Sequence, residues 1–260
     1  MMTAAINSLY LSRLLLNPRS RQVMSEIAQP YEMHRTLMRA FPQATDDTQS
    51  KARDEFGVLF RAEVDDLPGA TKVYIQSLKE PDWSFLDGLK DYLDADAEMP
   101  DVSCKDIMPA YQKLQNGQVL SFRLRANPTK RIAKDDDMMK GKRVELSRED
   151  EQIAWLIRKG LERERDVPGG FELLINEVKN VRNDVRRVPR INVCSEGKQQ
   201  GRKRDSASGY TTTHLAVLFE GFLRVTDKTA FVETLIRGIG SGKAFGFGLL
   251  SIAPVPAEAK

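Results

Sequence analysis

Apolar positions in the first 128 residues change between a two-residue and a helical period, in an order that predicts one α+β domain. The predicted elements are a strand at 9–16, helices at 20–29 and 31–41, strands at 55–64 and 72–78, a short helix at 84–93 and a strand at 118–128. Pro30 marks a new first turn between the two helices. The predicted order is β-α-β-β-(α)-β.

The same order begins again after residue 141. The predicted elements are a strand at 142–147, a helix at 148–164, strands at 171–181 and 213–225, a helix at 227–239, a glycine loop at 240–248 and a last strand at 249–255. Ser147 and Asp227 are the predicted N-caps of the two helices, and Gly221 a bend in its strand.

Two copies of this split βαβ order predict an α+β protein with two tandem ferredoxin-like (RRM-like) βαββαβ domains. The predicted N-terminal domain is 1–128. Residues 129–141, where apolar periodicity lapses, are a predicted linker, and 142–260 are the predicted C-terminal domain.

Composition excludes several classes of protein. The chain has 260 residues, 41% hydrophobic and 30% charged, and no apolar run approaches the roughly 18 residues of a membrane span. Its first residues lack the pattern of a signal peptide. Cys104 and Cys194 are too few for a disulfide framework, and with only two histidines no usual zinc spacing occurs. We therefore expect a cytoplasmic protein without a metal site.

Positive charge is concentrated in three segments, although the net charge is only +3. Arg123–Arg143 has eight Lys or Arg against three Asp, Val181–Arg190 has four Arg against one Asp, and Gly197–Arg204 has four basic residues and no acid. One such run is more often a solvated loop. Three in a chain of nearly balanced charge favour a surface that binds phosphates.

One of the two histidines, His34, lies in the predicted helix at 31–41. Tyr31 and His34 share one helix face, and Arg35 and Arg39 lie on a neighbouring face. The predicted core face carries Met33, Leu37 and Phe41. His34, Tyr31 and the two guanidinium groups could therefore converge on one anionic ligand.

Such a group suits RNA cleavage by the RNA's own 2′-hydroxyl. Imidazole titrates near pH ~6.5, so it can take or give a proton at neutral pH, and arginine can neutralise the phosphate oxygens. The alternative is an ordinary histidine on a helix surface or in the core. His214, at the start of an apolar strand, is predicted to be structural.

A glycine-rich segment, Arg237–Ser251, joins the last predicted helix to the last strand. Glycine lets backbone N–H groups approach phosphates. A Walker loop is excluded because Ala244 follows Lys243, and a Rossmann fingerprint because a strand follows. Tight packing and phosphate binding both remain open for this loop.

Several segments, taken together and in order, resemble the CasE family of CRISPR-associated endoribonucleases. They are LYLSRLLLNPRSR, QPYEMHRTLMRAFP, LSFRLRANPTKR, EQIAWLIRKG, VLFEGFLRV and GIGSGKAFGFGLLSIAP, between about Leu9 and Pro254. The resemblance implies tandem ferredoxin-like domains and metal-independent cleavage of CRISPR precursor RNA at the base of the repeat stem-loop. It also implies 5′-hydroxyl and 2′,3′-cyclic phosphate ends, an enzyme that stays on its product, and assembly with other Cascade subunits.

The resemblance also implies roles for particular residues. It makes His34 and Tyr31 catalytic, and it implies no cofactor and no metal. The implied RNA-binding residues are Arg35, Arg39, Lys130, Arg131, Lys142, Arg143, Gly238, Gly240, Ser241, Gly242 and Lys243. Residues 1–8 precede the strand that usually opens the family. The basic segment Val181–Gly209 is expected to form a hairpin or partly ordered loop that grips the stem.

Two other classes of function stay open at this point. The first is a non-catalytic RNA-binding scaffold, in which His34 only contacts the RNA. The second, less favoured, is a phosphate-cofactor enzyme that uses the glycine loop, for which no nucleotide-binding pattern is present.

Overall fold

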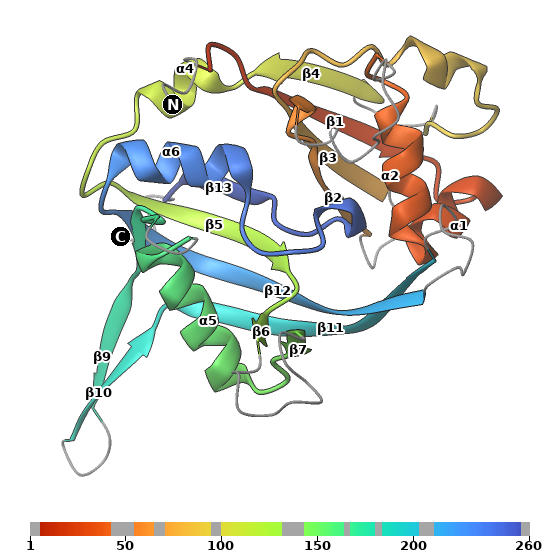
Figure 1. The fold of residues 1–260 in the computed structure, drawn as a ribbon. Helices are drawn as coiled ribbons and strands as arrows, with labels where there is room; N and C mark the ends of the chain where they lie inside the picture. Colours follow the sequence, from red (N-terminus) through yellow and green to blue (C-terminus); the bar gives the residue numbers. More distant parts are fainter. Residues whose placement is uncertain are drawn as a thin grey trace. The chain divides into compact units, whose positions relative to one another are not determined.

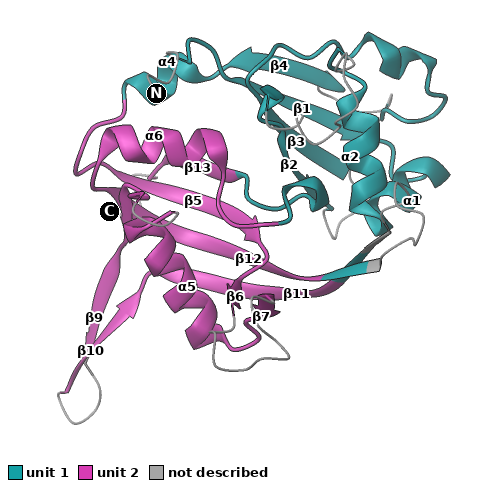
Figure 2. Cartoon of the chain, in the orientation of Figure 1, with its two compact units in different colours: residues 1–113, 199–213, 242–249 teal, residues 114–198, 214–241, 250–260 magenta. Residues whose placement is uncertain are grey.

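The computed structural model describes residues 6–42, 55–64, 71–94, 100–131, 143–163, 167–179, 184–202 and 211–255 (Figure 1). The chain divides into two compact units (Figure 2). Unit 1 comprises residues 1–113, 199–213 and 242–249, and unit 2 comprises 114–198, 214–241 and 250–260. Each unit therefore contains segments from both halves of the chain.

Unit 1 is built on a four-stranded antiparallel sheet. Its spatial order is β2 (Leu59–Glu63), β3 (Thr71–Ser77), β1 (Tyr10–Leu16) and β4 (Val102–Asp106). The two central strands are apolar toward the core, where Leu14, Val73 and Ile75 are fully buried. The edge strand β4 is largely exposed, because its residues VSCKD carry little apolar surface.

Two consecutive helices, α1 (Arg21–Ala28) and α2 (Pro30–Met38), pack on this sheet. Ser20 caps α1 by accepting from the backbone N–H of Val23, and Pro30 occupies the first turn of α2, as predicted. Met33 and Leu37 enter the hydrophobic core with Phe41, which confirms the predicted core face. A 3₁₀ segment, η1 (Ser84–Gly88), and a short helix, α4 (Met108–Gln112), complete the unit.

Unit 2 is built on a second antiparallel sheet. The strands lie in the order β11 (Ile191–Arg202), β12 (Thr211–Val225), β5 (Val119–Ala126) and β13 (Leu250–Pro254), and β8 (Phe171–Leu173) also pairs with β12. Its helices are α5 (Glu149–Leu161) and α6 (Lys228–Arg237). Two small antiparallel pairs are added, β6 (Thr129–Arg131) with β7 (Arg143–Glu145) and β9 (Ile175–Lys179) with β10 (Val185–Pro189).

Both sheets have the strand order of a βαββαβ fold. In unit 1 the first and third strands are central and antiparallel, with β2 and β4 at the edges. In unit 2 the corresponding central strands are β5 and β12, which pair with β13 and β8 or β11. The prediction of two tandem ferredoxin-like domains is thus confirmed.

The predicted domain boundary differs from the structure. Residues 118–128 were expected to close the N-terminal sheet, whereas β5 lies in the middle of the sheet of unit 2 and β4 closes unit 1. The start of the predicted linker, Thr129–Arg131, is strand β6, and residues 132–141 lie outside the described residues. Asp227 caps α6 as predicted, but the N-cap of α5 is Arg148 rather than Ser147.

Candidate functional site

Helix α2 places Tyr31 and His34 on one side, within unit 1. Their ring centroids lie 6.2 Å apart. The His34 ring is stacked on Phe60 of β2 at 6.1 Å, with 14° between the ring planes. The Tyr31 ring lies 5.7 Å from that of Phe245, which belongs to the glycine-rich segment. The helix, the sheet and the glycine-rich segment therefore meet at this pair of residues.

Both side chains are buried. His34 is 4% exposed and Tyr31 is 5% exposed. A histidine of the core would show the same burial, so exposure alone does not separate the two interpretations of His34. An imidazole enclosed by aromatic rings is in a low-dielectric site, where charges and hydrogen bonds act more strongly on a substrate that reaches them.

A buried carboxylate fixes the position of α2. Glu26 of α1 is 5% exposed. It accepts hydrogen bonds from the hydroxyl of Thr36 at 2.8 Å and from the hydroxyl of Tyr92 at 2.6 Å. Burial and the nearby Glu26 carboxylate both raise the pKa of Tyr92, so its hydroxyl stays protonated and remains a donor. The network joins both helices to the segment after η1 and so holds the backbone that carries His34.

The two predicted arginines of α2 have contacts of their own. Arg35 is exposed and forms an ion pair with Glu32 at 3.1 Å. The guanidinium group of Arg39 lies over the ring of Phe85 in η1, 4.5 Å from its centroid. The expected convergence of both guanidinium groups with His34 is not seen in the structure.

The glycine-rich segment bends through five residues with positive φ, at 238, 240, 242, 246 and 248. A Cβ on Gly240 would lie 3.1 Å from the Trp155 ring, and one on Gly242 would lie 2.9 Å from the Phe247 ring. Close packing therefore accounts for glycine at both positions. Of the five candidate residues in this segment, Gly238 is buried, and Gly240, Ser241, Gly242 and Lys243 are partly exposed.

The segment that contacts Tyr31 is the 3₁₀ turn η2 (Lys243–Phe245), which belongs to unit 1. The turn packs on α2 and β2. Lys243 begins η2, and Phe245, which contacts Tyr31, ends it. The turn η2 thus connects Lys243, a candidate phosphate-binding residue, with Tyr31, a candidate catalytic residue.

Arg61, which was not among the predicted site residues, holds this segment in place. Its side chain is 5% exposed, its Nη1 donates to the carbonyl oxygen of Leu249 at 3.2 Å, and its Nε donates to Glu63 at 2.8 Å. An arginine within the apolar strand sequence LFRAE is the signal that could have revealed it, because such a charge is buried only when it is paired.

The candidate residues of the first basic segment lie on the β6–β7 pair of unit 2. Arg131 and Arg143 are exposed and directly opposite each other across the two strands. Like charges in this relation repel, so an anion between them would stabilise the pair. Lys130 is also exposed and forms an ion pair with Glu151 at 3.1 Å. Lys142 lies outside the described residues.

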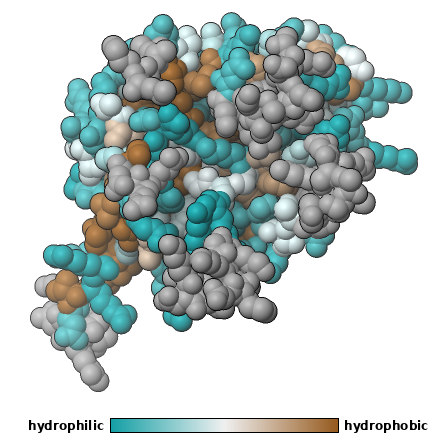
Figure 3. Space-filling model, viewed as in Figure 1, coloured by the Kyte–Doolittle hydropathy of each residue, from teal (hydrophilic) through white to brown (hydrophobic). Residues whose placement is uncertain are grey.

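The hairpin or loop predicted at 181–209 is only partly a hairpin. Val185–Pro189 is strand β10, which pairs with β9, whereas Ile191–Arg202 is strand β11 of the main sheet. Residues 180–183 and 203–210 lie outside the described residues. Arg186 and Arg187 are exposed on β10, and Arg187 pairs with Glu177 at 3.4 Å. Large apolar residues are exposed on the same hairpin and appear brown at the lower left of Figure 3: Ile175, Val178, Val185 and Val188. The hairpin thus presents both charge and apolar surface.

The second histidine has the structural surroundings that were predicted for it. Nδ1 of His214 lies 2.9 Å from the side-chain nitrogen of Asn127, and the imidazole is half-buried. This burial lowers the pKa of His214, although the nearby Glu145 opposes the change.

Within the described part of the chain, no group of three or more His, Cys, Asp or Glu side chains is placed to hold a metal ion. No helix there has the length and apolar character needed to cross a membrane.

Comparison with known proteins places the whole chain in one family. A model of the CRISPR-associated protein family matches residues 9–254. The CRISPR-associated endoribonuclease Cse3 of Thermus thermophilus is 39% identical over 248 residues, which cover 95% of this chain and 100% of the relative. The CRISPR system Cascade subunit CasE of Escherichia coli is 32% identical, covering 86% of this chain and 92% of the relative.

A solved structure agrees with the sequence relatives. The endoribonuclease Cse3 bound to a 19-nucleotide RNA aligns with a TM-score of 0.70 and 38% identity, over 95% of this chain and 100% of that chain. The chain therefore belongs to the CRISPR-associated protein family that includes Cse3 and CasE.

Proposed function

We propose that this protein is an endoribonuclease that cleaves CRISPR precursor RNA at the base of the repeat stem-loop and stays bound to the product within Cascade. The observation that carries the proposal is the placement of His34 and Tyr31 together on α2, against the turn that contains Lys243. The endoribonuclease Cse3, at 39% identity, and the Cascade subunit CasE, at 32%, support the substrate class and the assembly.

The reaction requires two proton transfers. The 2′-oxygen loses its proton and attacks the adjacent phosphorus, the bond from phosphorus to the 5′-oxygen breaks, and the leaving oxygen gains a proton. We assign one of these transfers to His34, because imidazole is the side chain whose unperturbed pKa lies closest to neutral pH. Tyr31 donates a hydrogen bond that orients the sugar or the phosphate. The products are a 2′,3′-cyclic phosphate and a 5′-hydroxyl, and no step requires a metal ion.

The burial of His34 sets a condition on this mechanism. The ring is 4% exposed, and Phe60 and Tyr31 lie beside it. The scissile phosphate can reach the imidazole only if RNA binding moves some of the residues that enclose it. Because Phe245 of η2 lies against Tyr31 and belongs to a short turn, this turn is the element that we expect to move.

Basic surfaces of unit 2 bind the stem in this account. Arg131 and Arg143 face each other across β6 and β7, a geometry that suits one phosphate between two guanidinium groups. Lys130 adds a further candidate contact in unit 2. Gly240 and Ser241 of unit 2 and Gly242 and Lys243 of unit 1, all partly exposed, are also candidates. These contacts hold the duplex and carry little sequence information by themselves.

The burial of His34 also favours a second candidate function, a non-catalytic scaffold subunit that binds the RNA hairpin. In that case His34 packs on Phe60 and contributes only to stability. The two functions share the basic surfaces and differ in whether the RNA is cut.

Incubation with a repeat hairpin labelled at either end tests the proposal. We expect a single cut at the base of the stem, with a 5′-hydroxyl on one product and a cyclic phosphate on the other, and the same rate in excess EDTA. Intact RNA would favour the scaffold. A 5′-phosphate product, or inhibition by EDTA that magnesium reverses, would exclude the mechanism that we assign to His34.

A further inference from the structure

A cavity of about 710 Å³ lies on the sheet of unit 2. It contains none of the residues named individually as catalytic or RNA-binding, although Arg123 and Arg190 belong to the first and second basic segments. It is on the face that the helices leave open. Trp155 of α5 stacks on Phe219 of β12, so that helix covers the Phe219 face. Because side chains alternate along a strand, Glu220 and Phe222 point to the opposite face, and both line the cavity.

The walls of the cavity come from the sheet and from the base of the β9–β10 hairpin. Arg123 of β5 lies opposite Glu220 of β12, and the two are joined by an ion pair at 2.6 Å. Asn176 of β9 and Asn192 of β11 lie on the hairpin side. The backbone N–H of Phe222 donates to the carbonyl of Arg190 at 3.1 Å, which fastens the returning strand to the sheet.

The most specific feature is a stack of a guanidinium group on an aromatic ring. The Arg190 guanidinium lies over the Phe222 ring, 4.3 Å from its centroid. A planar guanidinium group held on an aromatic ring is a platform on which a nucleobase can stack. Gly221 makes the arrangement possible, since a Cβ there would lie 2.2 Å from the Arg190 carbonyl oxygen.

The charge and polarity of the lining match one class of ligand. Two arginines and one glutamate are among the lining residues, a composition that suits a phosphate. The amide groups of Asn176 and Asn192 each offer a donor and an acceptor, as the edge of a nucleobase requires. A volume of about 710 Å³ is in the range of small-ligand sites and accommodates a nucleotide.

We propose that this cavity binds an unpaired nucleotide of the RNA, next to the stem-loop, with its base stacked on Arg190. The site is suited to a single-stranded segment because a base within a duplex cannot present its face. The inference rests on the proposed function, because the nucleotide belongs to the RNA that the protein is proposed to cleave. It concerns the affinity for that RNA and not the cleavage step.

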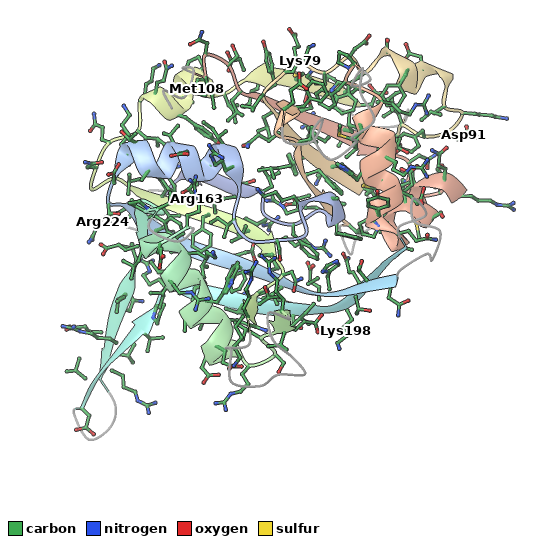
Figure 4. All side chains as sticks on the ribbon, in the orientation of Figure 1. Lys79, Asp91, Met108, Arg163, Lys198 and Arg224 are labelled. Carbon is green, nitrogen blue, oxygen red and sulfur yellow. The ribbon has the colours of Figure 1, made fainter. Side chains whose placement is uncertain are left out.

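The test compares a bare repeat hairpin with the same hairpin carrying unpaired extensions, each with a 2′-deoxy nucleotide at the scissile position to prevent cutting. Dissociation constants are measured for the full-length protein and for Arg190→Gln. The matched control is Arg224→Gln. Arg224, labelled in Figure 4, is two residues beyond Phe222 on the same strand. It is not among the residues that line the cavity, and it forms an ion pair with Glu172 at 3.0 Å.

In the unaltered protein, we expect an extension to tighten binding by about ten-fold, which is the effect of one stacked base. Arg190→Gln should remove this gain without changing the affinity for the bare hairpin. Arg224→Gln should keep the gain. The exposed Asn192→Ala provides a second variant that leaves the strand register intact, and it should reduce the gain as well.

Three results would overturn the inference. The first is no gain from any extension. The second is an equal loss of affinity for both RNAs in Arg190→Gln. The third is an undiminished gain from the extension in Arg190→Gln. Failure of the proposed function is separate, because it would appear as absent cleavage of the ordinary hairpin.

Discussion

The carboxylate of Glu26 accepts a 2.6 Å hydrogen bond from the hydroxyl of Tyr92, which is 66 residues away in the sequence. Thr36 donates to the other carboxylate oxygen, so one buried acid joins both helices of unit 1 to the segment after η1. Removing the acid would leave two buried hydroxyl groups without their acceptor.

Glu26→Ala should therefore lower the free energy of unfolding by about 3 kcal/mol, since each unsatisfied buried group costs roughly 1–3 kcal/mol. Urea unfolding measures the change. Glu32→Ala is the matched control, because Glu32 is partly exposed on the neighbouring helix and its ion pair with Arg35 should contribute less than about 1 kcal/mol. Equal effects of the two substitutions would show that the Glu26 network does not fix α2.

Substitutions at three glycines can distinguish how backbone strain and steric crowding each affect the free energy of unfolding. Gly242→Ala adds a Cβ 2.9 Å from Phe247 at a φ of 82°, and Gly117→Ala meets nothing within 4 Å at a φ of 83°. Gly88→Ala has neither problem. We expect a loss of about 1–2 kcal/mol for Gly117→Ala, a larger loss for Gly242→Ala, and almost none for Gly88→Ala. A neutral Gly242→Ala in urea unfolding would contradict the packing of this turn.

Stability should depend on pH through His214. Because burial lowers its pKa in the folded protein, the unfolded chain binds a proton first as the pH falls. The free energy of unfolding should therefore decrease from about pH 6.5 downward, the ordinary pKa of histidine. Thermal unfolding of His214→Gln between pH 7.5 and 5 should show a smaller decrease. A decrease as steep as in the unaltered protein would assign the effect to another group.

The helix that carries His34 could be predicted, but its surroundings could not. Helical spacing identified Met33 and Leu37 as core positions, since each helix face is encoded within a few residues. The stacking of His34 on Phe60 and of Arg39 on Phe85 depends on partners 26 and 46 residues away, which no local pattern encodes.

The strands show the same limit, which is that partners distant in the sequence cannot be predicted from a local pattern. β5 has a clear alternation and was predicted as a strand. Its partners β12 and β13 come much later in the chain, at Thr211–Val225 and Leu250–Pro254, so its place in unit 2 could not be predicted. The edge strand β4 and most of β11 have polar, exposed sequences, VSCKD and INVCSEGKQQGR, without an apolar face to identify them.

Salt should weaken the binding of the repeat hairpin steeply, because each phosphate contact releases counterions. We expect the double variant Arg131→Gln/Arg143→Gln to reduce the slope of log affinity against log salt by about 1 to 2. Arg148→Gln should leave it nearly unchanged, since Arg148 is paired with Asp150 at 2.9 Å. Equal slopes for all three proteins would exclude the β6–β7 pair as a phosphate site.

The most direct test of the account is the single-turnover cleavage rate of His34→Ala on a repeat hairpin, measured beside the dissociation constant of the same RNA. His34→Gln and a thermal unfolding curve control for the loss of the contact with Phe60. We predict a rate at least about 100-fold lower, the contribution of one proton-transfer group, with affinity within about three-fold of the unaltered protein. Cleavage at the original rate would contradict the role of His34 as the proton-transfer group.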